Sequence, residues 1–242
     1  MVAVKTAEFC IVITRGQMMV KQVLIAAVLV AATAAWAQDG RWDVSANEAV
    51  VFSRQATGNG ISQSATVGSN LFGTIRYKFR PHHSLLFNYG RTLNSQIYQS
   101  DFDFHVATHM TEYTGAYMYS PFKKGRFEPF AFVGGGAIKF SPQSTWVDLP
   151  EVTDPSTNTK VPNNVQTNVG AVKETQPAFL YGLGVDYKLP RVRWFALRLQ
   201  YRGLLYDNPD FKVNGASGSN ISFFTGTKGH MAEPSIGLVF RF

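Results

Sequence analysis

Residues 178–205 read AFLYGLGVDYKLPRVRWFALRLQYRGLL, which is two alternating segments joined by a short turn at Leu189-Pro190-Arg191. In the first segment, every second position is bulky and apolar or aromatic: Phe179, Tyr181, Leu183, Val185 and Tyr187. The second segment repeats this row with Phe195, Leu197, Leu199, Tyr201 and Leu205. The intervening positions include Gly182, Gly184, Asp186, Arg198, Gln200 and Arg202. A period of two predicts strands, here with an apolar face toward lipid and a small or polar face toward a lumen.

Six further segments show the same alternation: residues 42–52, 71–79, 85–93, 104–119, 127–140 and 231–242. A strand that crosses a bilayer needs about 9–11 residues, and bacterial barrels contain an even number of such strands. The fold predicted for residues 38–242 is therefore all-β, an eight-stranded antiparallel up-and-down transmembrane β-barrel.

The alternation assigns the faces of residues 127–140 directly, whereas those of residues 42–52 and 104–119 are harder to assign. For residues 127–140 we predict that the lipid face carries Phe130, Phe132, Ile138 and Phe140, and that the lumen face carries Ala131, Val133, Gly135 and Ala137. Glu48 interrupts the outward row of residues 42–52, which predicts a bulge or an imperfect register. In residues 104–119 the alternation puts His105 and His109 on the lipid face. Either that end stands above the membrane or the phase slips near Met110.

The connections between the segments alternate in length without exception. Short connections lie near Pro81, Gly125 and Pro190. The long ones are residues 54–67, 94–103, 141–175 and 207–229. Outer-membrane barrels have short periplasmic turns and longer extracellular loops, so this alternation predicts which end faces outward.

The N-terminal residues have the features of a cleaved signal peptide rather than of a folded element. A basic stretch, Val20-Lys21-Gln22, precedes an apolar run at residues 23–32 and an Ala35-Trp36-Ala37 cleavage site. The apolar run is shorter than the roughly 20 residues of a spanning helix. Residues 1–37 are therefore predicted to be an N-terminal extension and signal peptide, with the true start at Met18 or Met19. The single cysteine, Cys10, lies in this segment, so the mature chain offers no cysteine chemistry.

The charge pattern narrows the function classes. The formal net charge is +7, but the basic residues are scattered and an export signal precedes them, which argues against nucleic acid as a partner. A soluble β-sandwich or lipocalin-like barrel is the alternative fold. In such a fold, the positions that hold the aromatic residues in this sequence would face water, so we disfavour it.

Several short motifs resemble those of the small outer-membrane β-barrel family that includes the OmpA transmembrane domain. They are Phe87-Asn88-Tyr89-Gly90, the run at residues 112–117 (EYTGAY), the run at residues 129–136 (PFAFVGGG) and the run at residues 233–242 (EPSIGLVFRF). This resemblance implies residence in the bacterial outer membrane, contact with its lipids and lipopolysaccharide, and a monomeric barrel. It also implies that the terminal aromatic, Phe242, is the assembly signal read by the barrel-assembly machinery. The chain stops at this residue, so no peptidoglycan-binding domain is implied.

The inward charges are candidates for a polar network in the lumen. An eight-stranded barrel is just wide enough for side chains to fill, and charges there must be paired. Pairing of neighbouring strand ends places Arg202 near Glu233 and Asp43 opposite Lys78. Arg76, Glu112 and Arg198 extend the set. The network is either a gate of a pore or a plug that closes the barrel, and we favour the plug.

Three histidines, His105, His109 and His230, fall near the extracellular rim and are candidates for a metal site or a catalytic base. No recognisable signature of lipid-modifying chemistry accompanies them, so solvated loop residues are the favoured interpretation, and no cofactor or metal is predicted. The leading hypothesis is a non-enzymatic barrel with a structural or surface-interaction role. The alternatives are a narrow channel for small or apolar solutes and a lipid A-modifying enzyme at the rim. The long connection at residues 141–175 is expected to be mobile or to carry surface recognition.

Overall fold

The computed structural model describes residues 40–99, 103–122, 124–154, 159–163, 172–190, 192, 194–211, 213–214, 220–221 and 225–241. The predicted signal peptide, the start codon at Met18 or Met19 and the predicted assembly signal Phe242 lie outside these residues. Among the described residues, no helix is long and apolar enough to span a bilayer.

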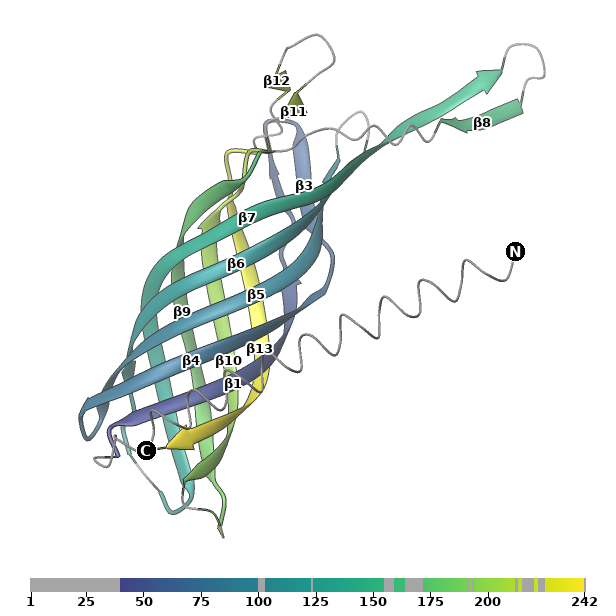
Figure 1. Ribbon diagram of the computed structural model, residues 1–242. Coiled ribbons are helices and arrows are strands. Elements are labelled where there is room, and N and C mark those ends of the chain that lie inside the picture. The colour runs from purple at the N-terminus through teal and green to yellow at the C-terminus, as the bar shows by residue number, and fades with distance from the viewer. Residues whose placement is uncertain are drawn as a thin grey trace, which may run out of the picture. The chain divides into compact units, whose positions relative to one another are not determined.

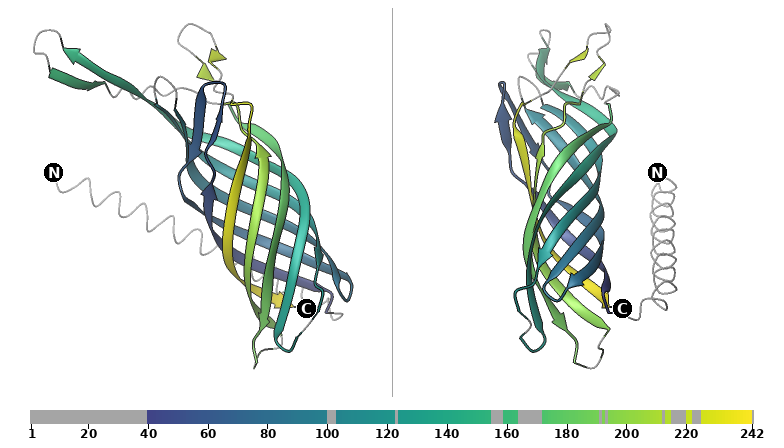
Figure 2. Two further views of the ribbon diagram at one scale, coloured as in Figure 1. Left: turned by 180° about the vertical axis from the view of Figure 1, so that it is seen from behind. Right: turned by 90° about the vertical axis from the view of Figure 1, so that its left-hand side faces the viewer.

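Eight long strands form a closed antiparallel barrel (Figures 1 and 2). In chain order they are β1 (Trp42–Ser53), β4 (Gly68–Arg80), β5 (His83–Gln99), β6 (Asp103–Tyr119), β7 (Phe127–Asp154), β9 (Glu174–Lys188), β10 (Phe195–Asp207) and β13 (Lys228–Arg241). Each pairs with the next in sequence, and β1 pairs with β13 from Asp43–Arg241 to Ser53–Met231. The predicted fold class and number of spanning strands are therefore confirmed.

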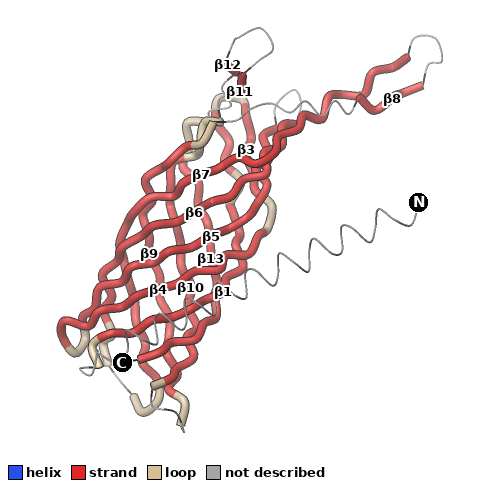
Figure 3. The backbone as a smooth tube through the Cα atoms, viewed as in Figure 1, coloured by secondary structure: helices blue, strands red, loops and turns tan. Residues whose placement is uncertain are grey.

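Shorter strands lie in the long connections, as the tube in Figure 3 makes visible. They are β2 (Ala56–Gly58), β3 (Ile61–Ala65), β8 (Thr159–Asn163), β11 (Val213–Asn214) and β12 (Asn220–Ile221). The β2–β3 hairpin turns at Asn59-Gly60, where both φ angles are positive (51° and 75°). This dipeptide is the usual one for a two-residue turn whose twist matches its strands. Strand β3 then pairs with β5, extending the barrel wall beyond the start of β4.

Burial alternates along the barrel strands, with inward side chains buried and outward ones largely exposed. Exposed aromatic residues near the short turns form a belt of ring contacts, including Phe127–Tyr187 and Trp194–Phe240 at centroid distances of 5.1 and 6.0 Å. Aromatic belts of this kind mark the level at which a barrel leaves the hydrocarbon.

The predicted faces of β7 are wrong. Phe130, Phe132, Ile138 and Phe140 are buried in the lumen, while Ala131 and Val133 lie on the outer surface. Gly134 and Gly136 share the inward face, and a Cβ on either would lie 2.0 Å from a carbonyl oxygen of β6. Small residues are required there because the two backbones approach closely.

The register settles the two segments whose faces were hard to assign, β6 and β1. Strand β6 pairs with β5 in one continuous register from His83–Tyr119 to Gln99–Asp103, so its phase does not slip near Met110. His105 and His109 do face outward, and with 17 residues each β5 and β6 exceed what a span requires. Glu48 is exposed within an unbroken β1–β13 register, so the predicted bulge is absent.

Candidate functional site

The lumen near the short turns is filled by an ionic cluster centred on Asp186. Asp186 of β9 is fully buried, and its cross-strand neighbour is Arg198 of β10. Arg198 donates two hydrogen bonds to it, from Nε to Oδ1 at 2.8 Å and from Nη2 to Oδ2 at 3.0 Å. Arg76 and Arg241 reach Oδ2 of the same carboxylate at 3.2 and 3.1 Å. One carboxylate therefore holds three guanidinium groups from three strands, an arrangement that suits the planar, forked donors of arginine.

Two further carboxylates complete this short-turn cluster. Asp43 of β1 contacts Arg76 and lies 3.1 Å from Nζ of Lys78. Glu128 of β7 accepts a hydrogen bond from Arg241 at 2.9 Å. The cluster therefore joins β1, β4, β7, β9, β10 and β13 across the lumen.

A second cluster lies nearer the long connections and is centred on Arg202 of β10. Arg202 contacts Glu112 of β6, and its Nε lies 2.8 Å from Oε2 of Glu233 of β13. Asn70 donates to Glu233 at 3.1 Å, and Thr114 donates to Glu112 at 2.6 Å. The guanidinium carbon of Arg202 also lies 4.1 Å from the ring centroid of Phe72, a cation–π distance.

Beyond Arg202 the lumen contains an apolar layer beside a buried polar group. The apolar layer is part of one hydrophobic cluster and includes Met110, Ile138, Phe140, Leu180, Leu204, Tyr206 and Met231. The polar group is Gln63, Gln96 and Asn94, joined by hydrogen bonds of 3.1 and 3.2 Å. The segment after β10 folds onto this layer: Phe211 is fully buried, 6.1 Å from Tyr98 and 6.3 Å from Phe140 between ring centroids. The Tyr98 hydroxyl donates to the carbonyl of Pro209 at 3.2 Å, which holds the segment in place. Residues 208–211 are called the cap below.

These layers fill the lumen with side chains that solvent does not reach. Arg76, Arg198 and Arg202 are each 1% exposed, and Phe72, Phe140 and Phe211 are at most 2% exposed. Solvent therefore does not contact these side chains, and the charges among them are neutralised by partners rather than by bulk water.

The structure places the seven predicted network residues in two clusters rather than one. Asp43, Arg76, Lys78 and Arg198 lie in the short-turn cluster, and Glu112, Arg202 and Glu233 lie around Arg202. Among the described residues, no ion pair joins the two clusters. Whether these residues have a role beyond structure stays a prediction.

Sequence reasoning missed Asp186, Glu128, Arg241 and the cap. Asp186 was recognisable, because it is an inward residue directly across from Arg198 once β9 and β10 pair. Glu128 was hidden by the inverted faces of β7. The cap carried no signal, because its residues lie in a long connection with no alternation.

The three rim histidines do not come together. His105 and His109 lie on β6 and His230 on β13, with three barrel strands between them in either direction. His230 is hydrogen-bonded to the hydroxyl of Tyr181 at 2.8 Å and stacks on its ring. In the part of the chain that the structure describes, no group of three or more His, Cys, Asp or Glu side chains is placed to bind a metal ion.

Comparison with known proteins identifies the family. Residues 23–223 match the model of the outer membrane protein beta-barrel domain. The chain belongs to this family. It is a bacterial outer-membrane protein, as the resemblance in the sequence implied, and the end with the long connections is extracellular by the topology of such barrels.

Several solved outer-membrane proteins are similar to this chain at low identity. The outer membrane protein OprG from Pseudomonas aeruginosa has 12% identity and a TM-score of 0.50, over 84% of this chain and 96% of its own. The Neisserial surface protein NspA has 15% identity and a TM-score of 0.42, over 84% and 98%. The outer membrane protease OmpT from Escherichia coli has 9% identity and a TM-score of 0.41, over 84% and 94%. A search of curated proteins found no match.

Proposed function

We propose that this outer-membrane barrel is a closed, non-enzymatic scaffold that holds surface structures at its extracellular end. The observation that carries the proposal is the filled lumen, in which two buried ionic clusters and an apolar layer follow one another along the barrel axis. A lumen built in this way resists deformation and does not offer a hydrated path.

The extracellular end supplies the surfaces that such a scaffold would present. Strand β7 has 28 residues, far more than a span of about 9–11 requires. Its distal part pairs with β8, so the hairpin continues beyond the barrel wall (Figure 1). The β2–β3 and β11–β12 hairpins rise from the same end. These hairpins are better suited to contact an extracellular partner than to bind a small solute.

Conductance tests the closed lumen. The purified protein is inserted into planar bilayers, with an open porin as the positive control. We expect no reproducible opening steps, because a guanidinium group that is 1% exposed cannot leave room for hydrated ions. Steps of constant size would contradict the proposal and favour the narrow channel. Uptake of a fluorescent apolar solute into liposomes tests that channel for uncharged cargo.

Two further assays test the remaining parts of the proposal. Incubation with lipopolysaccharide, followed by mass spectrometry of its acyl chains, should show no change; an altered acyl pattern would contradict the non-enzymatic assignment. Protease treatment of intact cells should cut within residues 141–175 and leave the barrel folded. Protection of that segment on intact cells would contradict surface display.

A further inference from the structure

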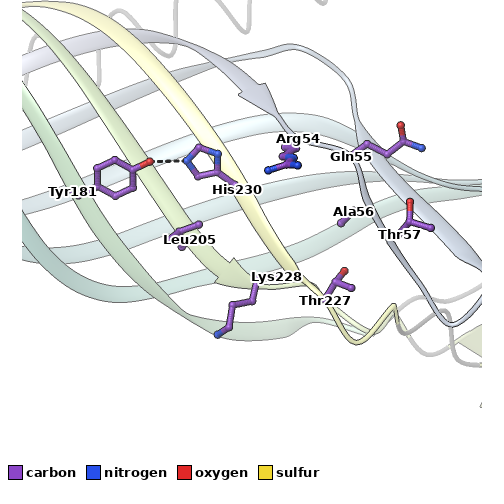
Figure 4. A pocket seen from close by; sticks show the side chains of 9 residues that line it. All are labelled: Arg54, Gln55, Ala56, Thr57, Tyr181, Leu205, Thr227, Lys228 and His230. Atoms are coloured by element: carbon purple, nitrogen blue, oxygen red, sulfur yellow. Dashed lines mark hydrogen bonds between the residues drawn. The ribbon is translucent and has the colours of Figure 1, made fainter.

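The outer wall has a hollow at the extracellular end of the seam between β1 and β13. Its volume is about 470 Å³, and it is lined by Arg54, Gln55, Ala56, Thr57, Tyr181, Leu205, Thr227, Lys228 and His230 (Figure 4). The backbone amide of Arg54 donates to the carbonyl of His230 at 2.9 Å, and Gly58 of β2 lies close to the backbone of Thr225. The hollow therefore lies on the outer side of a seam that stays closed above the last paired residues of β1.

Two cations border this hollow. Arg54 and Lys228 are both exposed, and Figure 4 draws them on different sides of it. Lys228 pairs with Asp207 at 3.1 Å, but with 76% and 47% of these side chains exposed the pair contributes little, so the ammonium group can turn to another anion. Among the described residues no acid pairs with Arg54. Hydroxyl and amide groups of Gln55, Thr57 and Thr227 also line the hollow.

The wall directly below the hollow is apolar. Phe52 precedes Arg54 by two residues on the same outward face, and Leu183 follows Tyr181 on β9, which runs toward the short turns; the two side chains are 48% and 62% exposed. In a membrane barrel these side chains lie against acyl chains, which places the hollow at the level of the lipid headgroups. A ligand that fits both parts has an anionic, hydroxyl-bearing head and an apolar tail.

We propose that this hollow binds the phosphorylated headgroup of an outer-leaflet glycolipid, with Arg54 and Lys228 contacting the phosphate. Arginine offers a forked donor to phosphate oxygens, and lysine offers a mobile point charge. The other polar lining residues contact sugar hydroxyls, while Leu205 and the apolar side chains below contact the first methylene groups. This inference does not depend on the closed lumen, so it can be tested independently of the proposed function.

The barrel carries a matched control on its opposite side. Arg91 of β5 and Lys139 of β7 are exposed outward cations, and both are in register with Thr111 of β6 between them. They carry the same charge and also face outward, but neither lines the hollow. The variant Arg91→Gln/Lys139→Gln therefore removes the same charge without altering the proposed site.

Native mass spectrometry of the full chain in detergent micelles provides the test. The probes are lipid A, the same lipid after enzymatic removal of its phosphates, and inorganic phosphate as a competitor. We expect Arg54→Gln/Lys228→Gln to weaken lipid A binding by about tenfold or more, because charge-assisted hydrogen bonds are lost. The dephosphorylated lipid should bind as weakly to the wild type as lipid A does to this variant.

The control variant and the competitor make the outcomes distinct. Arg91→Gln/Lys139→Gln should change binding by less than about twofold, since surface charges far from a site act weakly. An equal loss in both double variants would show diffuse attraction and overturn the site. Displacement of lipid A by inorganic phosphate at matching concentration would overturn the lipid assignment. Heat-modifiable migration on gels checks that every variant is folded.

Discussion

Near the periplasmic turns the lumen contains clustered carboxylates and guanidinium groups, whereas nearer the extracellular end it contains aromatic and aliphatic side chains beside the amides of Gln63, Asn94 and Gln96. Asp186 and its three arginines represent the first region, and Phe211, Tyr98 and Phe140 represent the second. Both regions exclude water, but they respond differently to damage. A buried ionic cluster fails when one partner is removed, because the others keep their desolvation cost, whereas an apolar layer loses only packing.

The difference also concerns how each region is built. Every member of the short-turn cluster comes from a barrel strand, so the cluster forms only when strands distant in sequence have paired. The apolar layer takes part of its material from the cap, a segment outside the strands. The extracellular closure can therefore be altered without disturbing the strand register.

The largest effect is expected for Asp186→Asn. This change leaves Arg76, Arg198 and Arg241 without their shared carboxylate, and breaking a buried pair costs about 3–5 kcal/mol. The free energy of unfolding in detergent, measured by guanidinium titration, should fall by this amount. Glu48→Gln is the control, because Glu48 is exposed on the outer face and its loss should be nearly neutral. A small effect at Asp186 would mean that the short-turn cluster is hydrated in solution.

Phe211→Ala should have the next largest effect. The fully buried ring leaves a cavity against Tyr98 and Phe140, which costs about 3 kcal/mol for a phenylalanine. The variant should still give no conductance in planar bilayers, because both ionic clusters remain below the cap. Opening steps in this variant would show that the cap alone closes the lumen.

Sequence reasoning recovered the parts of this comparison that depend on alternation and pairing. The eight strands and the neighbours Arg202 and Glu233 follow from a period of two and antiparallel register. The predicted long connection at residues 94–103 is wrong, because β5 continues to Gln99 and β6 begins at Asp103. Sequence reasoning did not recover the apolar layer, because it took large apolar side chains to face lipid. In β7 the outward residues from Ala131 to Ala137 are small, and the inward ones include Phe130, Phe132 and Phe140. Hydrophobicity alone does not assign the two faces of a strand when both faces contact apolar surroundings.

One residue in β7 carried the missing information. Glu128 has the same parity as Phe130, so the predicted faces implied a carboxylate on the outer wall beside the lipid. The cost of that placement favours the inward face, where Glu128 accepts from Arg241. The cap was beyond such reasoning, because its position depends on contacts between residues more than 60 positions apart, such as Phe140 and Phe211.

A smaller effect is expected at the periphery of the short-turn cluster. Lys78 has a side chain that is 17% exposed, and its partner Asp43 retains Arg76 when the lysine is lost. Lys78→Gln should lower the free energy of unfolding by about 1 kcal/mol or less, as for hydrated ion pairs. Added salt should reduce the difference between variant and wild type further. A loss as large as that of Asp186→Asn would show that the cluster has no hydrated edge.

The smallest effect is expected when the cluster around Arg202 is replaced as a whole. Arg202→Met combined with Glu112→Gln and Glu233→Gln removes every charge but keeps amide oxygens for Thr114 and Asn70. Replacing a complete buried ion set is often neutral, so the triple variant should unfold within about 1 kcal/mol of the wild type. Arg202→Met alone is the comparison, since it strands two buried carboxylates and should cost about 3–5 kcal/mol. If the triple variant is as unstable as Arg202→Met, the ion pairs of the Arg202 cluster contribute net stability. The charged and apolar regions of the lumen would then make similar contributions to the free energy of unfolding.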